Sequence, residues 1–212
     1  MSDVARLSAV AMADLIRRGE LTPTECTVAV LNRMAEWIPA LNPFVDFDPE
    51  GALIQARAAT DVMRHGAEIG PLHGVPVTIK NIQAVRGFPT MRGSRLASTE
   101  PAPADAPLVS RLRKAGAIVV GTTTMPEQAW TATSDSTLTG ATHNPWLLGR
   151  TAGGSSSGAA SLAGAGCGPL HLGTDGAGSI RVPAHFCGAV GFKPTYGRIP
   201  YVPVPNNASL SH

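Results

Sequence analysis

Residues 151–198 read TAGGSSSGAASLAGAGCGPLHLGTDGAGSIRVPAHFCGAVGFKPTYGR, and this stretch is the most informative part of the chain. It contains two glycine-flanked serine clusters, GGSSSG at 153–158 and GTDGAGS at 173–179. The first cluster precedes a helical pattern at 159–165, and the second follows a strand pattern at 170–172. A flexible Gly/Ser linker lacks neighbours that are patterned for packing. We therefore interpret both clusters as ordered turns, followed by a further strand at 189–192.

The residues upstream alternate between helical and strand patterns. Apolar residues recur at helical spacing over 5–18, 22–37 and 48–65, and the second of these segments begins with the capping box Thr22-Pro23-Thr24-Glu25. β-rich runs occupy 43–47, 75–80 and 118–120, with a helix expected at 107–114. This alternation predicts an α/β domain with a central sheet.

The composition excludes several classes of protein. Of 212 residues, 43% are hydrophobic and 15% are charged, and 17 basic against 15 acidic residues give a net charge of +2. This hydrophobic content argues against disorder, and a nearly neutral chain has no general attraction for nucleic acid or an anionic membrane. The apolar runs are shorter than the ~20 residues of a membrane-spanning helix. The N-terminus, with Asp3, lacks the apolar region of a signal peptide, so we expect a cytoplasmic protein.

The cysteines indicate neither a disulfide framework nor a zinc site. Cys26, Cys167 and Cys187 are odd in number and show no C-x-x-C spacing. We expect them to be buried thiols.

The second serine cluster suggests nucleophilic chemistry. Small residues at 176–178 leave backbone amides uncovered before Ser179, so this serine could attack a carbonyl while the amides bind the oxyanion. A serine needs a base, and six histidines are available: His65, His73, His143, His171, His185 and His212. Lys80 is the other candidate. It ends an apolar strand, where a lysine either reaches out to solvent or is buried and becomes neutral, which requires its pKa to fall by roughly 3 units.

Two other sites fit less well. The pattern G-x-S-x-G at 154–158, with Ser156, Asp175 and His185 in the order of an α/β-hydrolase, lacks the buried strand that should precede it. The glycines at 173–178 match neither G-x-x-x-x-G-K-[ST] nor G-x-G-x-x-G, so we do not expect a nucleotide site.

Several blocks of the sequence resemble one known family. They are GPLHGVPVTIKN (70–81), GAIVVGTTTMPE (116–127), GATHNPW (140–146), GGSSSGAAS (153–161), LGTDGAGSIRVPA (172–184) and FCGAVGFKPTYGR (186–198). Their identity and order resemble the amidase signature family. The resemblance implies a mixed central β-sheet flanked by helices on both faces. It divides the chain into an N-terminal helical segment packing on the core (1–70) and the first part of the α/β core (71–212).

The resemblance also implies an activity and its residues. The family hydrolyses amides through an acyl-enzyme, releasing ammonia or an amine, with a Ser–cis-Ser–Lys triad. Ser179 matches the nucleophile, Ser155 the bridging serine in a cis peptide, and Lys80 the base. The oxyanion hole matches the amides of Gly176, Ala177, Gly178 and Ser179. No metal or organic cofactor is implied, the expected partner is a small-molecule amide, and a homodimer is possible.

The chain departs from the family pattern at several positions. Asn81 stands where the family usually has Asp, Ser157 and Ala177 replace glycines, and Thr122 and Thr124 replace Lys and Asn. Members of the family are also much longer, so we expect residues 1–212 alone to be a poor enzyme. Two alternatives stay open: the glutaminase-type component of a tRNA-dependent amidotransferase (its A chain), and a truncated, non-catalytic chain.

Overall fold

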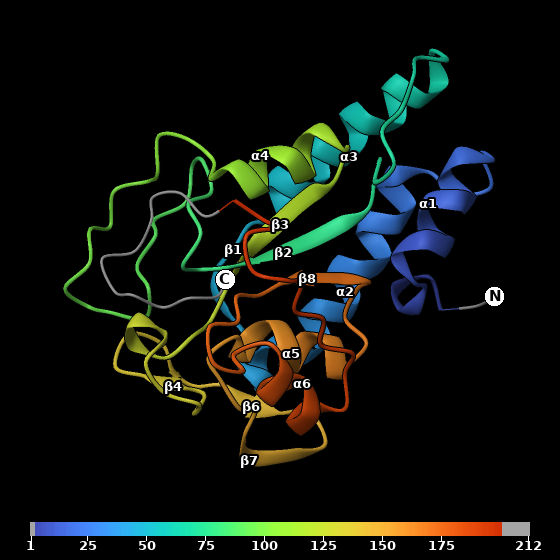
Figure 1. Cartoon of the computed structure of the whole chain (residues 1–212). Helices are drawn as coiled ribbons and strands as arrows, with labels where there is room; N and C mark the ends of the chain where they lie inside the picture. Colours follow the sequence, from blue (N-terminus) through green and yellow to red (C-terminus); the bar gives the residue numbers. More distant parts are fainter. Residues whose placement is uncertain (1–2, 201–212) are drawn as a thin grey trace.

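A mixed four-stranded sheet organises residues 3–200, the part of the chain that the computed structural model describes (Figure 1). Its order is β1-β3-β2-β8, with β1 at Phe44–Phe47, β2 at Pro76–Lys80, β3 at Ile118–Thr123 and β8 at Leu170–Leu172. β2 runs parallel to both β3 and β8, whereas β1 is antiparallel to β3. The predicted mixed sheet is therefore confirmed.

The helices largely follow the predicted segments. They are α1 (Ala9–Arg17), α2 (Pro23–Leu41), α3 (Pro49–Arg64), α4 (Pro107–Lys114), α5 (Ser157–Gly164) and α6 (Arg181–Cys187), with short 3₁₀ turns at Val4–Arg6 and Glu127–Ala129. The capping box at Thr22 opens α2 as predicted. This helix continues past the expected end at 37 to Leu41, with Pro39 in its last turn, and it ends where Asn42 adopts a left-handed conformation.

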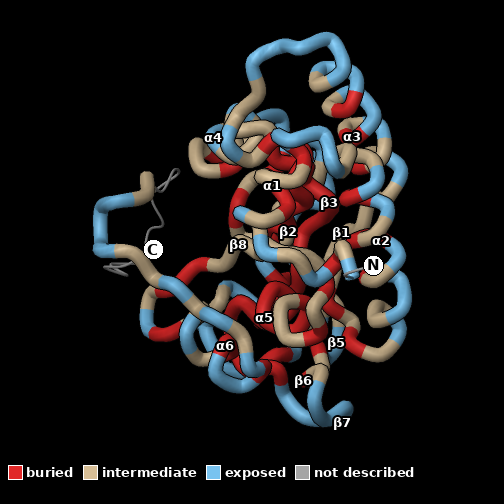
Figure 2. The backbone as a smooth tube through the Cα atoms, turned by 90° about the vertical axis from the view of Figure 1, so that its right-hand side faces the viewer, coloured by how far each residue is buried: buried red, intermediate tan, exposed pale blue. Residues whose placement is uncertain are grey.

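Two apolar cores lie on opposite faces of the sheet. Along β3, Ile118 and Val120 belong to the larger core, to which α1, α2, α3 and α5 contribute. Val119, between them, faces the smaller core with Val109 of α4. Helices thus cover both faces, as Figure 1 shows, and the buried residues concentrate along the sheet and α5 (Figure 2).

The N-terminal segment contributes to the sheet as well as covering it. β1 comes from residues 1–70 and pairs with β3, so this segment and the remainder of the described chain share one sheet. The polar region after β3 forms two small antiparallel pairs, β4 (Asp135–Ser136) with β5 (Gly140–Ala141) and β6 (His143–Asn144) with β7 (Leu147–Thr151).

One predicted strand is wrong. Residues 189–192 form no strand, and Val190 and Phe192 are 99% and 76% exposed. The apolar run has no neighbouring strand within residues 3–200, so its pattern alone does not make it pair. The helix α6, which we did not predict, precedes it. Its Pro183 is tolerated because the first-turn amides of a helix have no intrahelical partners.

The three cysteines are free and buried, as expected. Over residues 3–200, the helices lack the combination of length and hydropathy that crossing a membrane requires.

Candidate active site

Lys80 is the centre of a buried polar cluster. The residue is 0% exposed, so the alternative in which it reaches out to solvent is wrong. Its Nζ donates hydrogen bonds to Ser155 Oγ at 2.6 Å and to Thr174 Oγ1 at 3.0 Å. The strand order explains this meeting. β2 and β8 are parallel, with Ile79 opposite Leu172, so Lys80 and Thr174 both lie at the carboxyl ends of neighbouring strands.

Burial changes the proton affinity of this lysine. Desolvation lowers the pKa of Lys80 to about 7, against a smaller opposing effect of the Asp175 charge, which raises it. A substantial fraction of Lys80 is therefore neutral near neutral pH and able to accept a proton.

Ser155 sits just before the first turn of α5. The peptide bond between Gly154 and Ser155 is cis, as the resemblance implies, and Ser155 is fully buried. Gly154 packs directly on the carbonyl oxygen of Thr133, so a Cβ at this position would overlap the backbone. The glycine thus allows the close approach that carries Ser155 under the end of β2.

Ser179 lies on the turn between β8 and α6. Its carbonyl oxygen accepts a hydrogen bond of 3.0 Å from the amide of Ser156, which ties the turn to α5. Within residues 3–200 the Ser179 hydroxyl makes no hydrogen bond. The structure therefore joins Lys80 to Ser155, but it does not join Ser155 to Ser179 by a hydrogen bond.

The amides of the turn are not all available for an oxyanion. The Gly178 amide donates to Asp175 Oδ1 at 2.6 Å, so this donor is already occupied, contrary to our expectation. The amides of Ala177 and Ser179 have no partner among the described residues.

Asp175 is held as an anion. Burial by itself would raise the pKa of this carboxyl, but hydrogen bonds from Arg181 and from the Gly178, Arg181 and Ile180 amides together hold the pKa well below its usual range.

The structure contradicts the alternative triad. Ser156 is buried, and its Oγ both donates to Thr174 O and accepts from the Thr174 amide, each at 3.2 Å. The described partners of the Asp175 carboxylate are Gly178, Ile180 and Arg181, whereas His185 is exposed on α6. Ser156, Asp175 and His185 therefore form no catalytic triad.

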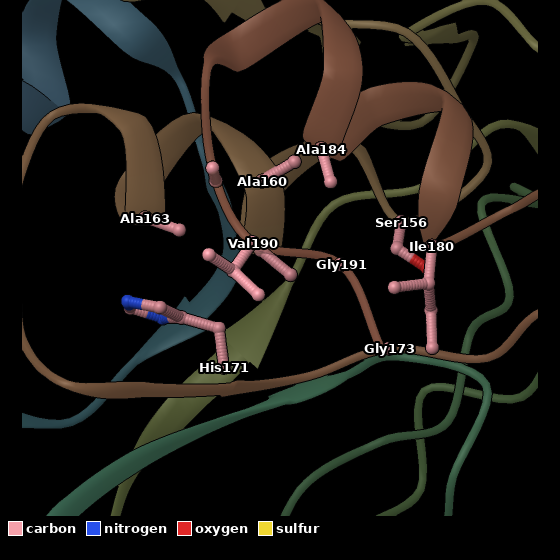
Figure 3. A pocket seen from close by; sticks show the side chains of 11 residues that line it. Ser156, Ala160, Ala163, His171, Gly173, Ile180, Ala184, Val190 and Gly191 are labelled. Carbon is pink, nitrogen blue, oxygen red and sulfur yellow. The ribbon is translucent and has the colours of Figure 1, made fainter. Parts of the chain in front are cut away.

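His171 is also not a base for these serines. Its ring nitrogens contact Thr78 Oγ1 and the Gly168 carbonyl, and burial lowers its pKa to about 4. Figure 3 shows His171 and Ser156 at opposite ends of a small pocket between α5, α6 and β8. This pocket of about 50 Å³ is too small for an amide substrate.

Sequence reasoning missed Thr174 as a partner of Lys80. The signal that could have found it is its place just after the 170–172 strand. If that strand is paired in parallel with 75–80, residues at the two carboxyl ends become neighbours.

Asn81 stands where the family usually has Asp, and both polar atoms of its side chain have hydrogen-bond partners. Its Nδ2 donates to Pro89 O and Thr122 Oγ1, and its Oδ1 accepts from the amides of Met91 and Arg92. An ionised Asp could not donate to the Pro89 carbonyl, so the neutral amide suits this environment. Thr122 continues the chain of hydrogen bonds to Asp46.

The described residues offer no group of three or more His, Cys, Asp or Glu side chains that could hold a metal ion.

The mixed sheet and the buried hydrogen bond between Lys80 and Ser155 place the chain among the α/β proteins that contain a buried serine–lysine pair. A family model described as Amidase matches residues 25–212. The chain belongs to this family, the amidase signature proteins.

The similar proteins are amidases and components of amidotransferases. The chain is 44% identical to an acylamidase of Rhodococcus erythropolis, over 92% of the chain and 41% of that protein. It is 42% identical to the A component of the glutamyl-tRNA(Gln) amidotransferase of Acidothermus cellulolyticus, over 94% of the chain and 39% of that protein. The crystal structure of a bacterial aryl acylamidase matches with a TM-score of 0.89 and 31% identity, over 97% of the chain and 43% of that structure. The chain thus spans about 40% of the length of these relatives.

Proposed function

We propose that the protein is an amide hydrolase in which Ser179 is the nucleophile, Ser155 the proton relay and Lys80 the base. The observation that carries the proposal is the 2.6 Å hydrogen bond between the buried Lys80 Nζ and Ser155 Oγ. A lysine with a pKa of about 7 can accept a proton that a hydroxyl passes on.

In the first half of the reaction, Ser179 Oγ forms a bond to the amide carbonyl carbon. Its proton moves to Ser155, while the Ser155 proton moves to Lys80. The amides of Ala177 and Ser179 would stabilise the oxyanion. Collapse of the tetrahedral intermediate breaks the C–N bond, and the proton returns from Lys80 through Ser155 to the leaving nitrogen.

In the second half, water attacks the acyl-enzyme ester. It loses its proton along the same route, the Ser179–acyl bond breaks, and Ser179 recovers a proton. The Ser179 hydroxyl would need to move into contact with Ser155 when substrate binds, since catalytic hydrogen bonds often tighten only in the substrate complex.

The nucleophile is tested by covalent labelling of the protein expressed from its complete reading frame. A fluorophosphonate probe should label Ser179, and Ser179→Ala should lose both the label and amide turnover. Ser156→Ala is the matched control, because it removes a neighbouring serine that is hydrogen-bonded to Thr174. Turnover by Ser179→Ala within tenfold of the parent would contradict the proposal.

A second candidate is the glutaminase-type component of a tRNA-dependent amidotransferase. The identity to the acylamidase (44%) is nearly equal to the identity to the amidotransferase component (42%), which favours keeping this candidate. Turnover of free amides by the isolated protein supports the hydrolase, whereas ammonia release that requires partner chains supports the amidotransferase.

We expect a small-molecule amide as substrate, a cytoplasmic location and a possible homodimer. Cell fractionation and light scattering check the last two.

A further inference from the structure

The carboxylate of Asp175 accepts five hydrogen bonds. This side chain is fully buried. It accepts from the amides of Gly178 (2.6 Å), Ile180 (3.2 Å) and Arg181 (3.2 Å), and from two nitrogens of the Arg181 guanidinium, Nε and Nη2, at 2.9 Å each. The mechanism above gives neither Asp175 nor Arg181 a role.

These hydrogen bonds determine which amides of the turn that carries Ser179 remain available to a ligand. Asp175 engages the amides immediately before and after Ser179, those of Gly178 and Ile180. The Ala177 and Ser179 amides stay without a partner in the described part of the chain. One carboxylate thus binds the amides on both sides of Ser179 and leaves those of Ala177 and Ser179 for an oxyanion.

The same carboxylate is the charged neighbour of Lys80. Its charge raises the pKa of Lys80, against the larger lowering by burial. Arg181, whose side chain is 55% exposed, pairs with Asp175 at 2.9 Å and offsets part of that charge.

Other charged groups around Lys80 are engaged elsewhere. β3 and α5 pack against β2, and their sequences contain no charged residues. His171 of β8 is engaged with Thr78. On α2, Glu25 belongs to the capping box and Arg33 pairs with Glu36. Asp46 of β1 contacts Thr122.

We propose that Asp175 and Arg181 form a positioning pair, which shapes the Ser179 turn and balances the charge beside Lys80. The pair touches neither the reacting atoms nor the substrate in the mechanism above. The inference rests on the proposed function, because it assigns Lys80 as the base.

The two members of the pair should shift the titration of Lys80 in opposite directions. Asp175→Asn removes a negative charge, so the pKa of Lys80 falls. Arg181→Gln leaves the carboxylate uncompensated, so the pKa rises. Each shift should be about 0.5–1 pH unit. Structural damage alone would not produce shifts of opposite sign.

The experiment follows the ε-carbon of Lys80 by ¹³C NMR as a function of pH, in the protein expressed from its complete reading frame. The signal is assigned by its loss in Lys80→Met. The pH dependence of fluorophosphonate labelling is measured in parallel, and its acidic limb should move with the NMR titration. Arg181→Lys, which keeps the charge but loses the two-nitrogen contact, should remain close to the parent in pKa while labelling more slowly.

The matched control is the ion pair between Arg113 and Asp105, which lies at 3.1 Å on the α4 side of the sheet. Asp105→Asn should leave the Lys80 titration unchanged. Arg181 is exposed, so Arg181→Gln should fold even if Asp175→Asn does not, and an unchanged or lowered Lys80 pKa in Arg181→Gln overturns the inference. Failure of the parent to label at Ser179 counts instead against the proposed function, and the NMR titration still decides the charge balance.

Discussion

Lys80 and Ser155, 75 positions apart in the sequence, are joined by a hydrogen bond of 2.6 Å in a fully buried site. Burial on all sides makes this contact chemically useful. In water the lysine would stay protonated at neutral pH, whereas here its pKa is lowered to about 7. The serine hydroxyl can donate to the neutral lysine amine and accept from another hydroxyl, so it can connect a buried base to a more exposed nucleophile.

Replacing Lys80 separates a lysine base from a histidine base. Lys80→Arg should fail as badly as Lys80→Ala, because a guanidinium does not release its proton near pH 7. We expect each variant to lose about 10²–10⁴-fold in kcat/KM. His185→Ala should keep most activity, since this side chain is exposed. The opposite pattern, tolerated Lys80 variants and an inactive His185→Ala, would show that histidine is the base.

Lys80 also makes stability depend on pH. Its pKa is about 7 when folded and close to 10.5 when unfolded. Between these values the unfolded chain binds more protons, so the contribution of Lys80 to the free energy of unfolding increases as pH rises from about 7 to 10. At pH 7 the burial of this amine costs free energy, because its proton affinity is lower in the folded state than in the unfolded one. Lys80→Met should remove this cost and stabilise the fold at pH 7 by on the order of 2 kcal/mol.

Thermal unfolding of parent and Lys80→Met at pH 7 and 9.5 measures this difference. The gap between the two proteins should narrow at the higher pH. A gap that stays constant would mean that Lys80 keeps its ordinary pKa.

Gly158 should be essential for docking α5 on the sheet. A Cβ there would overlap the Pro43 carbonyl oxygen and lie 2.6 Å from Thr124 Oγ1. We expect Gly158→Ala to destabilise the fold by about 3 kcal/mol or more.

The matched control for this prediction is Gly19→Ala. Its new Cβ would meet nothing within 4 Å, and its φ of +72° costs about 1 kcal/mol for a non-glycine residue. Chemical denaturation of both variants makes the comparison, and similar losses would contradict the packing argument.

Residues 1–212 expressed alone should self-associate. β8 pairs only with β2 within the described residues and borders an apolar pocket of about 360 Å³, whose lining includes Leu170, Leu172 and Phe192. An unpaired edge beside apolar surface favours association. Light scattering should detect oligomers, and Val190→Ser with Phe192→Ser should reduce them. A monodisperse monomer with a cooperative transition would disprove this expectation.

Local patterns were sufficient for much of the fold. The capping box at Thr22 marks the start of α2, and the apolar runs at 75–80 and 118–120 mark β2 and β3, because each signal depends on residues close together in the chain. Where a prediction depended on a partner far away in the sequence, the local pattern gave a wrong result. The run 189–192 looks like a strand, yet pairing is a property of two segments, and this run has no neighbouring strand within residues 3–200.

The sequence by itself determined the family, the α/β class and the identity of the candidate residues Lys80, Ser155 and Ser179, since these follow from residue types in a recognisable order. Only the tertiary structure decided their environment. The parallel pairing of β2 with β8 brings Thr174 to Lys80, and Ser155, which lies 75 positions from Lys80 in the sequence, reaches the same amine. Burial and hydrogen-bond partners are set by segments that meet across the sheet, and a pattern along one segment carries no information about which other segment will cover it.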